Sequence, residues 1–136
     1  MFRGVAPVPL PATGRALLQV LGSAPEIEMA NVIDVARYIL DKLGPISAMK
    51  LQKLVYYCQS WHLVWDEQPL FPSAIKAWSN GPVVPELWKH HRGMFKVFPT
   101  AIPGDASALT ESEQSTVDAV LSHYGDKSAQ YLIELT

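Results

Sequence analysis

Cys58 and His62 are the two residues whose types and spacing could do chemistry together. They stand four residues apart, so on a helix they share one face, where a thiolate and an imidazole can form a nucleophilic pair or half of a metal site. No second cysteine follows at the spacing of a metal ligand. Both side chains also fit an apolar helix face, so we expect Cys58 to be a buried, inert thiol and His62 to be a hydrogen-bonded core residue.

Other candidates for chemistry are weaker. His90 and His91 are adjacent and point about 100° apart on a helix, which is poor geometry for chelation, so we expect both to be exposed. The sequence contains no glycine-rich phosphate loop and no motif of a serine hydrolase or a zinc protease. We therefore predict that the protein is not an enzyme and that it holds no cofactor and no metal.

The stretch from Lys50 to Trp65 must position the residues above. On a helical wheel an apolar arc includes Leu51 and Leu54, and further bulky side chains lie outside that arc. A helix with bulk on several sides is surrounded by neighbours, so we predict that this is the central helix of the domain. Lys53 lies outside the arc, and we expect it to be exposed. The residues that characterise this helix are Lys50, Leu51, Gln52, Lys53, Leu54, Tyr56, Tyr57 and Trp61.

Shorter elements are predicted around that helix. Apolar residues at helical spacing predict a helix over 32–43, which Gly44 and Pro45 end. Thr110 and Glu113 form a capping box that opens a helix stopped by Gly125, and a last helix covers 129–136. The runs 74–78 and 94–98 have strand character. The fold class is thus mainly α (α+β): a helical domain around one central helix, with a small two- or three-stranded β element.

A proline-rich connector follows the first of these runs. Gly81 can adopt backbone angles closed to other residues, and Pro82 and Pro85 each fix a φ angle. We expect a rigid strand-to-helix connector that holds the flanking tryptophans in set places, either to anchor a partner or, if the connector only shapes the fold, within the core. The candidate connector and partner-binding residues are Trp78, Gly81, Pro82, Val83, Val84, Pro85, Glu86, Trp88 and Lys89.

Composition limits the broad class of protein. The 136 residues suffice for one domain, and a single cysteine excludes an internal disulfide and fits the cytoplasm. No apolar run approaches the roughly 20 residues of a membrane span. The net charge of −2 does not favour nucleic acid, although residues 37–96 carry eight basic and four acidic residues (+4) and residues 105–136 carry one and six (−5). Residues 1–28 hold four prolines, and we expect a flexible extension there.

The ordered series of motifs resembles the Panacea domain, the family of SocA-type antitoxins and phage-associated GepA-like proteins. The resemblance runs from about Asn31 to Thr136. It rests on the central-helix residues, Pro69-Leu70-Phe71, Ile75-x-Ala77-Trp78 and Gly81-Pro82-Val83-Val84-Pro85. It implies a mainly helical domain at 29–136 and an antitoxin that binds and neutralises a cognate toxin encoded beside it. In one branch the antitoxin is a proteolytic adaptor that delivers its toxin to the ClpXP protease.

The chain departs from the family pattern at its end. Family members continue with a histidine and a Pro-Trp pair, where this chain stops at Thr136. We therefore expect a C-terminally truncated domain. Two alternatives stay open: a prophage-encoded regulator that binds nucleic acid, and a thiol or metal enzyme that uses Cys58 and His62. The regulator would need Lys50, Lys53, Lys89, Arg92 and Lys96 on one face. The oligomeric state cannot be predicted from the sequence.

Overall fold

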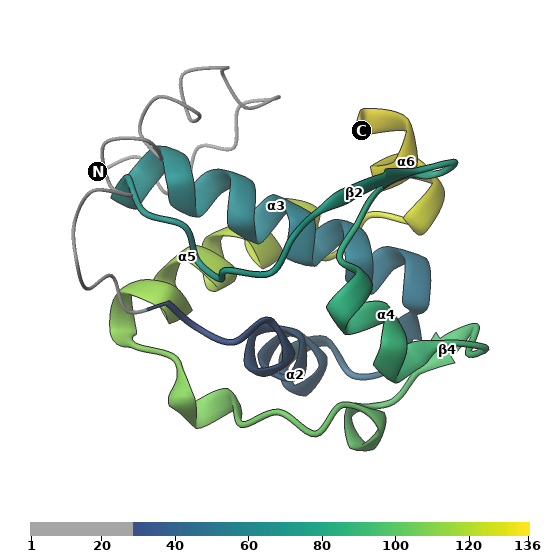
Figure 1. Cartoon of the computed structure of the whole chain (residues 1–136), viewed down its shortest axis with the longest axis horizontal. Coiled ribbons are helices and arrows are strands. Elements are labelled where there is room, and N and C mark those ends of the chain that lie inside the picture. The colour runs from purple at the N-terminus through teal and green to yellow at the C-terminus, as the bar shows by residue number, and fades with distance from the viewer. Residues whose placement is uncertain (1–28) are drawn as a thin grey trace.

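The computed structural model describes residues 29–136, so the predicted extension over residues 1–28 lies outside the described part. No helix within 29–136 is long and apolar enough to cross a membrane. The elements, shown in Figure 1, are α2 (Val32–Leu43), β1 (Ile46–Ser47), α3 (Ala48–Asp66), β2 (Lys76–Trp78), β3 (Gly81–Val83), α4 (Pro85–His91), β4 (Lys96–Val97), the 3₁₀ turns η1 (Pro99–Ala101) and η2 (Ala106–Ala108), α5 (Glu111–Tyr124) and α6 (Ala129–Leu135).

Helix α3 is the centre of the fold. It packs against α2, α5, α6 and β3, and Figure 1 shows α2 almost end-on beneath it. Leu51, Leu54 and Cys58 are fully buried along it, and Trp61 is nearly so. Burial on several sides confirms the predicted central helix and the mainly helical fold class.

Side-chain caps define where the helices begin. Asn31 Oδ1 accepts a hydrogen bond from Ile33 N at 2.8 Å ahead of α2, and Ser47 Oγ accepts from Lys50 N at 3.1 Å ahead of α3. At the start of α5, Thr110 and Glu113 form the predicted capping box. These bonds satisfy amide groups that the first helical turn leaves without partners, which is why the sequence predicts the starts well.

The β structure consists of two separate antiparallel pairs within the described residues. Strands β2 and β3 form a hairpin, with Lys76 opposite Val83 and Trp78 opposite Gly81. Strand β4 pairs instead with β1, the short segment before α3. The runs 74–78 and 94–98 both contain a strand, as the sequence indicates, and each run pairs with a different partner.

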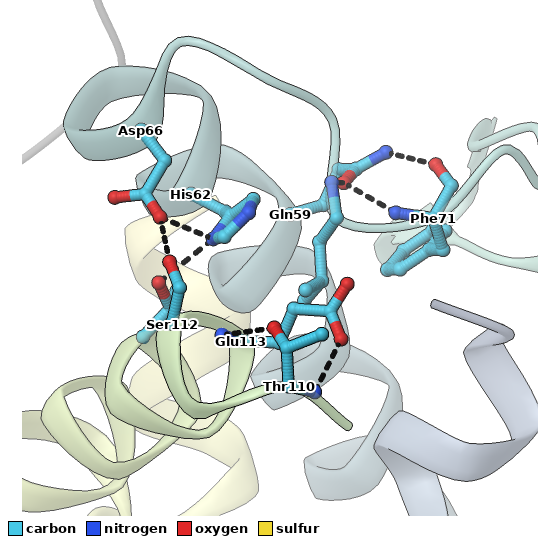
Figure 2. Close-up of polar contacts among 9 residues, drawn as sticks. Gln59, His62, Asp66, Phe71, Thr110, Ser112 and Glu113 are labelled. Carbon is cyan, nitrogen blue, oxygen red and sulfur yellow. Dashed lines mark hydrogen bonds and ion pairs between the residues drawn. The ribbon is translucent and has the colours of Figure 1, made fainter. Parts of the chain in front are cut away.

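A glutamine of α3 fixes the chain that enters the hairpin. Gln59 Oε1 accepts hydrogen bonds from Leu70 N at 2.6 Å and Phe71 N at 3.2 Å, while its Nε2 donates to Phe71 O at 2.7 Å, as Figure 2 shows for Phe71. The amide group thus bonds the extended segment as a neighbouring strand would. Leu70 and Phe71 are both fully buried, so this segment belongs to the core.

Candidate partner-binding site

The connector closes the hairpin and starts α4. Gly81 has φ +103°, a conformation that other residues rarely adopt. Pro82 follows in β3, and its carbonyl accepts a hydrogen bond from Lys53 Nζ at 2.8 Å. Pro85 occupies the first turn of α4, where its missing N–H costs nothing. Gly81 therefore supplies the unusual backbone angle and Pro85 begins the helix, and β3 itself belongs to the connector.

Gln52 of α3 holds the end of the connector. Its Oε1 accepts from Val84 N at 2.9 Å, and its Nε2 donates to Val84 O at 3.2 Å. The same Nε2 lies 2.8 Å from His91 Nε2. Because Gln52 donates there, the His91 nitrogen acts as the acceptor and the ring is neutral. Burial lowers the pKa of His91, which favours the same neutral form.

A pocket of about 190 Å³ opens beside the connector, between the start of α3, the hairpin and α4. Its walls are mostly apolar. The lining residues are Ala48, Met49, Gln52, Trp78, Val83, Trp88, His91, Gly93 and Met94.

Two tryptophans form one wall of the pocket. The rings of Trp78 and Trp88 meet edge to face, with centroids 5.6 Å apart and an angle of 81° between their planes. Trp78 is 42% exposed, although tryptophan side chains are usually well buried. The Arg92 guanidinium lies 5.3 Å from the centroid of the Trp88 ring, so a cation borders the aromatic wall.

Exposed apolar residues continue past the pocket. Met94 is 43% exposed and Phe95 is 85% exposed, and both lie between α4 and β4. The carbonyl of Phe95 accepts a hydrogen bond from Ala48 N at 2.8 Å, which fixes this segment to the start of α3. A contiguous apolar surface held in place by backbone bonds is a common property of protein-binding sites.

Comparison with known protein families identifies the family of this chain. The family model for the antitoxin SocA-like, Panacea domain matches residues 51–136, well over half of the sequence. The chain belongs to this family. No curated protein and no solved structure matches it. The match begins at Leu51, inside α3, and the resemblance over residues 31–50 stays a prediction.

In this Panacea domain the predicted candidate residues fall into two groups. Trp78, Val83 and Trp88 line the pocket, whereas Val84 is buried in the core and does not line it. Glu86 and Lys89 are exposed on α4 outside the lining residues. Glu86 accepts a hydrogen bond from Ser73 Oγ at 2.8 Å. The central-helix residues lie in or beside the core of the Panacea domain, and only Gln52 among them lines the pocket.

Two predictions of exposure are wrong. Lys53 is fully buried, and its ammonium group contacts the connector, because the hairpin and the last residue of the chain cover that side of α3. Desolvation accordingly lowers the pKa of Lys53. His91 is also buried, facing Gln52. A helical wheel shows which residues share a face but not which long-range segments cover that face.

About half of the residues that line the pocket were not predicted from the sequence. Ala48 and Met49 come from the first turn of α3, while Gly93 and Met94 follow α4. The pairing of β1 with β4 brings these two segments together over nearly fifty residues of intervening chain. The one local sign of this part of the wall in the sequence is Met94-Phe95, two large apolar residues that follow a glycine.

An enzyme that uses Cys58 and His62 would need an accessible thiol, and the thiol of Cys58 is not accessible. Cys58 is fully buried, and desolvation raises the pKa of its thiol. His62 is also buried; its Nδ1 lies 2.7 Å from Thr116 Oγ1 and 3.8 Å from Asp66 Oδ2, and Ser112 Oγ donates to the same carboxylate (Figure 2). Within residues 29–136 no group of three or more metal-ligating side chains comes together.

Two of the five cations on which the nucleic-acid hypothesis depends, Lys50 and Lys53, are bonded within the fold. Lys53 is buried beneath the hairpin, and Lys50 Nζ donates to Gly125 O at 2.6 Å. Burial lowers the pKa of Lys50, with Asp126 acting in the opposite direction. The remaining cations, Lys89, Arg92 and Lys96, are exposed, and Arg92 lies over the Trp88 ring of the pocket wall. Three charges give a weak electrostatic footprint for a duplex.

Proposed function

We propose that this Panacea domain is the antitoxin of a toxin–antitoxin pair and neutralises a toxin encoded beside it by direct protein contact in the cytoplasm. Membership in the antitoxin SocA-like family supports the class of function. The observation that supports the surface is Trp78, which is 42% exposed and held edge to face against Trp88 beside a rigid connector. Tryptophan is among the residue types that most often anchor interfaces.

The connector favours binding for a physical reason. Pro82 and Pro85 restrict the backbone, and Lys53 and Gln52 bond the connector to α3 at Pro82 and Val84. A surface that is already ordered loses less conformational entropy when it binds. The hairpin therefore presents Trp78 at low entropic cost.

Growth rescue tests this proposal. The protein encoded by the adjacent gene is expressed from an inducible promoter, with and without the Panacea protein, and colony formation is counted. We expect the wild-type chain to restore growth and to co-purify with the toxin. Gln68→Glu, an exposed change in the bend after α3 and outside both the pocket lining and region 105–136, is the control and should behave as wild type. A neighbouring product that does not inhibit growth, or inhibition that the wild-type chain leaves unchanged, would contradict the proposal.

Charge reversal on α4 locates the surface. Glu86→Lys and Lys89→Glu change exposed side chains, so folding should persist while the toxin affinity changes, and Lys89→Glu should weaken it. Circular dichroism checks the fold, and calorimetry with purified toxin measures the affinity. If both reversals leave neutralisation intact, the acidic region 105–136 becomes the better candidate for the binding surface.

The adaptor role is a separate part of the proposal. An adaptor shortens the half-life of its toxin only when the ClpXP-type protease is present. Toxin half-life is therefore measured after translation is stopped, with and without the antitoxin, in strains that have or lack the protease. Rescue that persists without the protease means that contact alone neutralises the toxin.

A further inference from the structure

We infer that the pocket between Trp78, Trp88 and Met94 takes one large apolar side chain from an acidic segment of the partner. This inference rests on the proposed function, because the partner is the toxin that the Panacea domain neutralises. It goes further by stating the chemistry of the segment that docks.

The size of the pocket sets the size of its occupant. Its volume is about 190 Å³. An engineered apolar cavity of about 150 Å³ is enough to take up benzene. The pocket therefore has room for one aromatic or branched aliphatic side chain and not for a folded element. An interface of this kind is a single anchor in a pocket, surrounded by weaker contacts.

The chemistry of the wall selects an apolar occupant. The apolar side chains of Ala48, Met49, Val83 and Met94 line the pocket together with the two indole rings. Gln52 contributes a polar group, but its amide already bonds Val84 and His91. A polar side chain entering the pocket would lose its water without a comparable return from that amide.

The rim of the pocket is basic. Lys76 and Trp78 stand two residues apart on β2 and so share a face, and Lys76 lies opposite Val83, which lines the pocket. Arg92 covers the Trp88 ring. Further exposed cations follow at Lys89 and Lys96.

These cations are not matched inside the described part of the chain. Within residues 29–136 the ion pairs join cations elsewhere, on α2, on α3 and beside α6, and none involves Lys76, Lys89, Arg92 or Lys96. From Lys76 to Lys96 the one acidic residue is Glu86, which bonds Ser73. A segment with carboxylates on either side of its anchor would complement this rim and would be steered toward it.

A second copy of the chain is the competing occupant, because region 105–136 is acidic and carries the exposed Tyr131 on α6. Contact between the pocket of one copy and α6 of another could be reciprocal in a two-fold dimer or head to tail in rings and open chains. An antitoxin acts on a different protein, so we favour the toxin segment.

Selection from a random peptide library displayed on phage tests the inference without the toxin. The whole 136-residue chain is the bait, and synthetic versions of the enriched peptides are titrated by fluorescence polarisation. We expect one aromatic or large aliphatic residue flanked by Asp or Glu. Arg92→Glu and Lys76→Glu should each weaken binding about tenfold, whereas Lys127→Glu should not. Enriched peptides that lack acidic residues would overturn the inference.

Two variants of pocket-lining residues distinguish peptide binding in the pocket from binding elsewhere on the chain. Ala48→Phe fills the pocket and should abolish peptide binding; circular dichroism checks that it folds. Met94→Glu places a carboxylate at an exposed lining position, so it should fold and repel an acidic peptide. Peptides that bind both folded variants as tightly as they bind the wild type would overturn the inference. Concentration-dependent self-association through the pocket, measured by light scattering, would also overturn it.

The outcomes separate the inference from the proposed function. If the wild-type chain, Met94→Glu and Arg92→Glu all neutralise the toxin equally, the antitoxin function stands and the pocket inference falls. If acidic peptides bind the pocket but no neighbouring toxin is neutralised, the pocket chemistry stands and the proposed function falls.

Discussion

The two tryptophan pairs of this protein have similar spacing and opposite surroundings. Trp61 and Trp65 stack on α3 with centroids 5.4 Å apart and planes 25° apart, and Trp61 is 3% exposed. Trp78 and Trp88 meet at 5.6 Å and 81°, and Trp78 is 42% exposed. The first pair lies among the helices, whereas the second belongs to the hairpin and α4.

This difference separates stability from recognition. A buried indole contributes mainly through the apolar area that it removes from water. An exposed indole that is held by its neighbours keeps much of that area available for a partner. The sequence places all four tryptophans between residues 61 and 88, so residue type alone does not distinguish the two roles.

The largest expected effect is on the buried pair. Trp61→Ala should lower the free energy of unfolding by about 3–5 kcal/mol, because it leaves a large cavity beside α3. Trp78→Ala should cost less than about 1 kcal/mol in stability but weaken toxin binding by tenfold or more. Urea titrations measure the first quantity, and calorimetry measures the second. Equal, small stability losses from both would mean that α3 is peripheral.

Gly81 should give the next largest effect. Gly81→Val forces a branched residue to φ +103°, and a Cβ there would lie 2.9 Å from Lys53 Nζ and from Thr136 Oγ1. We expect a loss of about 2–3 kcal/mol in the free energy of unfolding. Gly93 is the matched control, because its φ is also positive but nothing lies within 4 Å of its added Cβ. If Gly93→Val costs as much as Gly81→Val, backbone strain alone explains the loss and the close approach to Lys53 contributes nothing.

Lys53 joins the core to the connector, and its removal should have a smaller effect. Lys53→Ala should cost about 1–2 kcal/mol, because the Pro82 carbonyl loses its donor and the buried stem leaves a gap. Lys53→Met removes the same ammonium group but keeps most of the buried stem, so it leaves a smaller gap and should cost less. Chemical denaturation at pH 7 compares the two. A loss below about 0.5 kcal/mol for Lys53→Ala would be typical of a surface lysine and would contradict its burial.

The smallest expected effect is a pH dependence from His91. Its pKa is lowered in the folded state by burial, so the unfolded chain takes up a proton first as the pH falls. The contribution of His91 to stability is full above about pH 6.5 and declines as the pH falls toward the lowered folded value. His91→Gln keeps an acceptor for Gln52 and does not titrate. The stability of the wild-type chain relative to this variant should therefore fall between pH 7 and 5, and parallel curves would contradict the prediction.

Local rules predicted the helices well. The range Val32–Leu43 and the starts of α3, α5 and α6 follow from capping residues and breakers a few positions away. The environment of the polar residues of α3 did not follow in this way. Gln52, Lys53 and Gln59 lie outside the apolar arc of the wheel but are buried, because the hairpin region covers that side.

The candidate site was predicted in part for the same reason. The connector and its tryptophans can be recognised from glycine, proline and tryptophan types alone. The pocket needs the start of α3 and the segment after α4 as well, and only the pairing of β1 with β4 brings them together. Pairing between short strands far apart in sequence leaves no periodic pattern to read.

The two glutamines of α3 stand one heptad apart, on the same helix face, and each bonds the backbone at one end of the hairpin segment: Gln59 at Leu70 and Phe71, Gln52 at Val84. The segment between these anchors, residues 72–83, is thus a cassette with fixed ends. A substitution at either glutamine should therefore release one end of the cassette while the other end stays bonded to α3. Trp78 lies between the two ends, so its position depends on both glutamines.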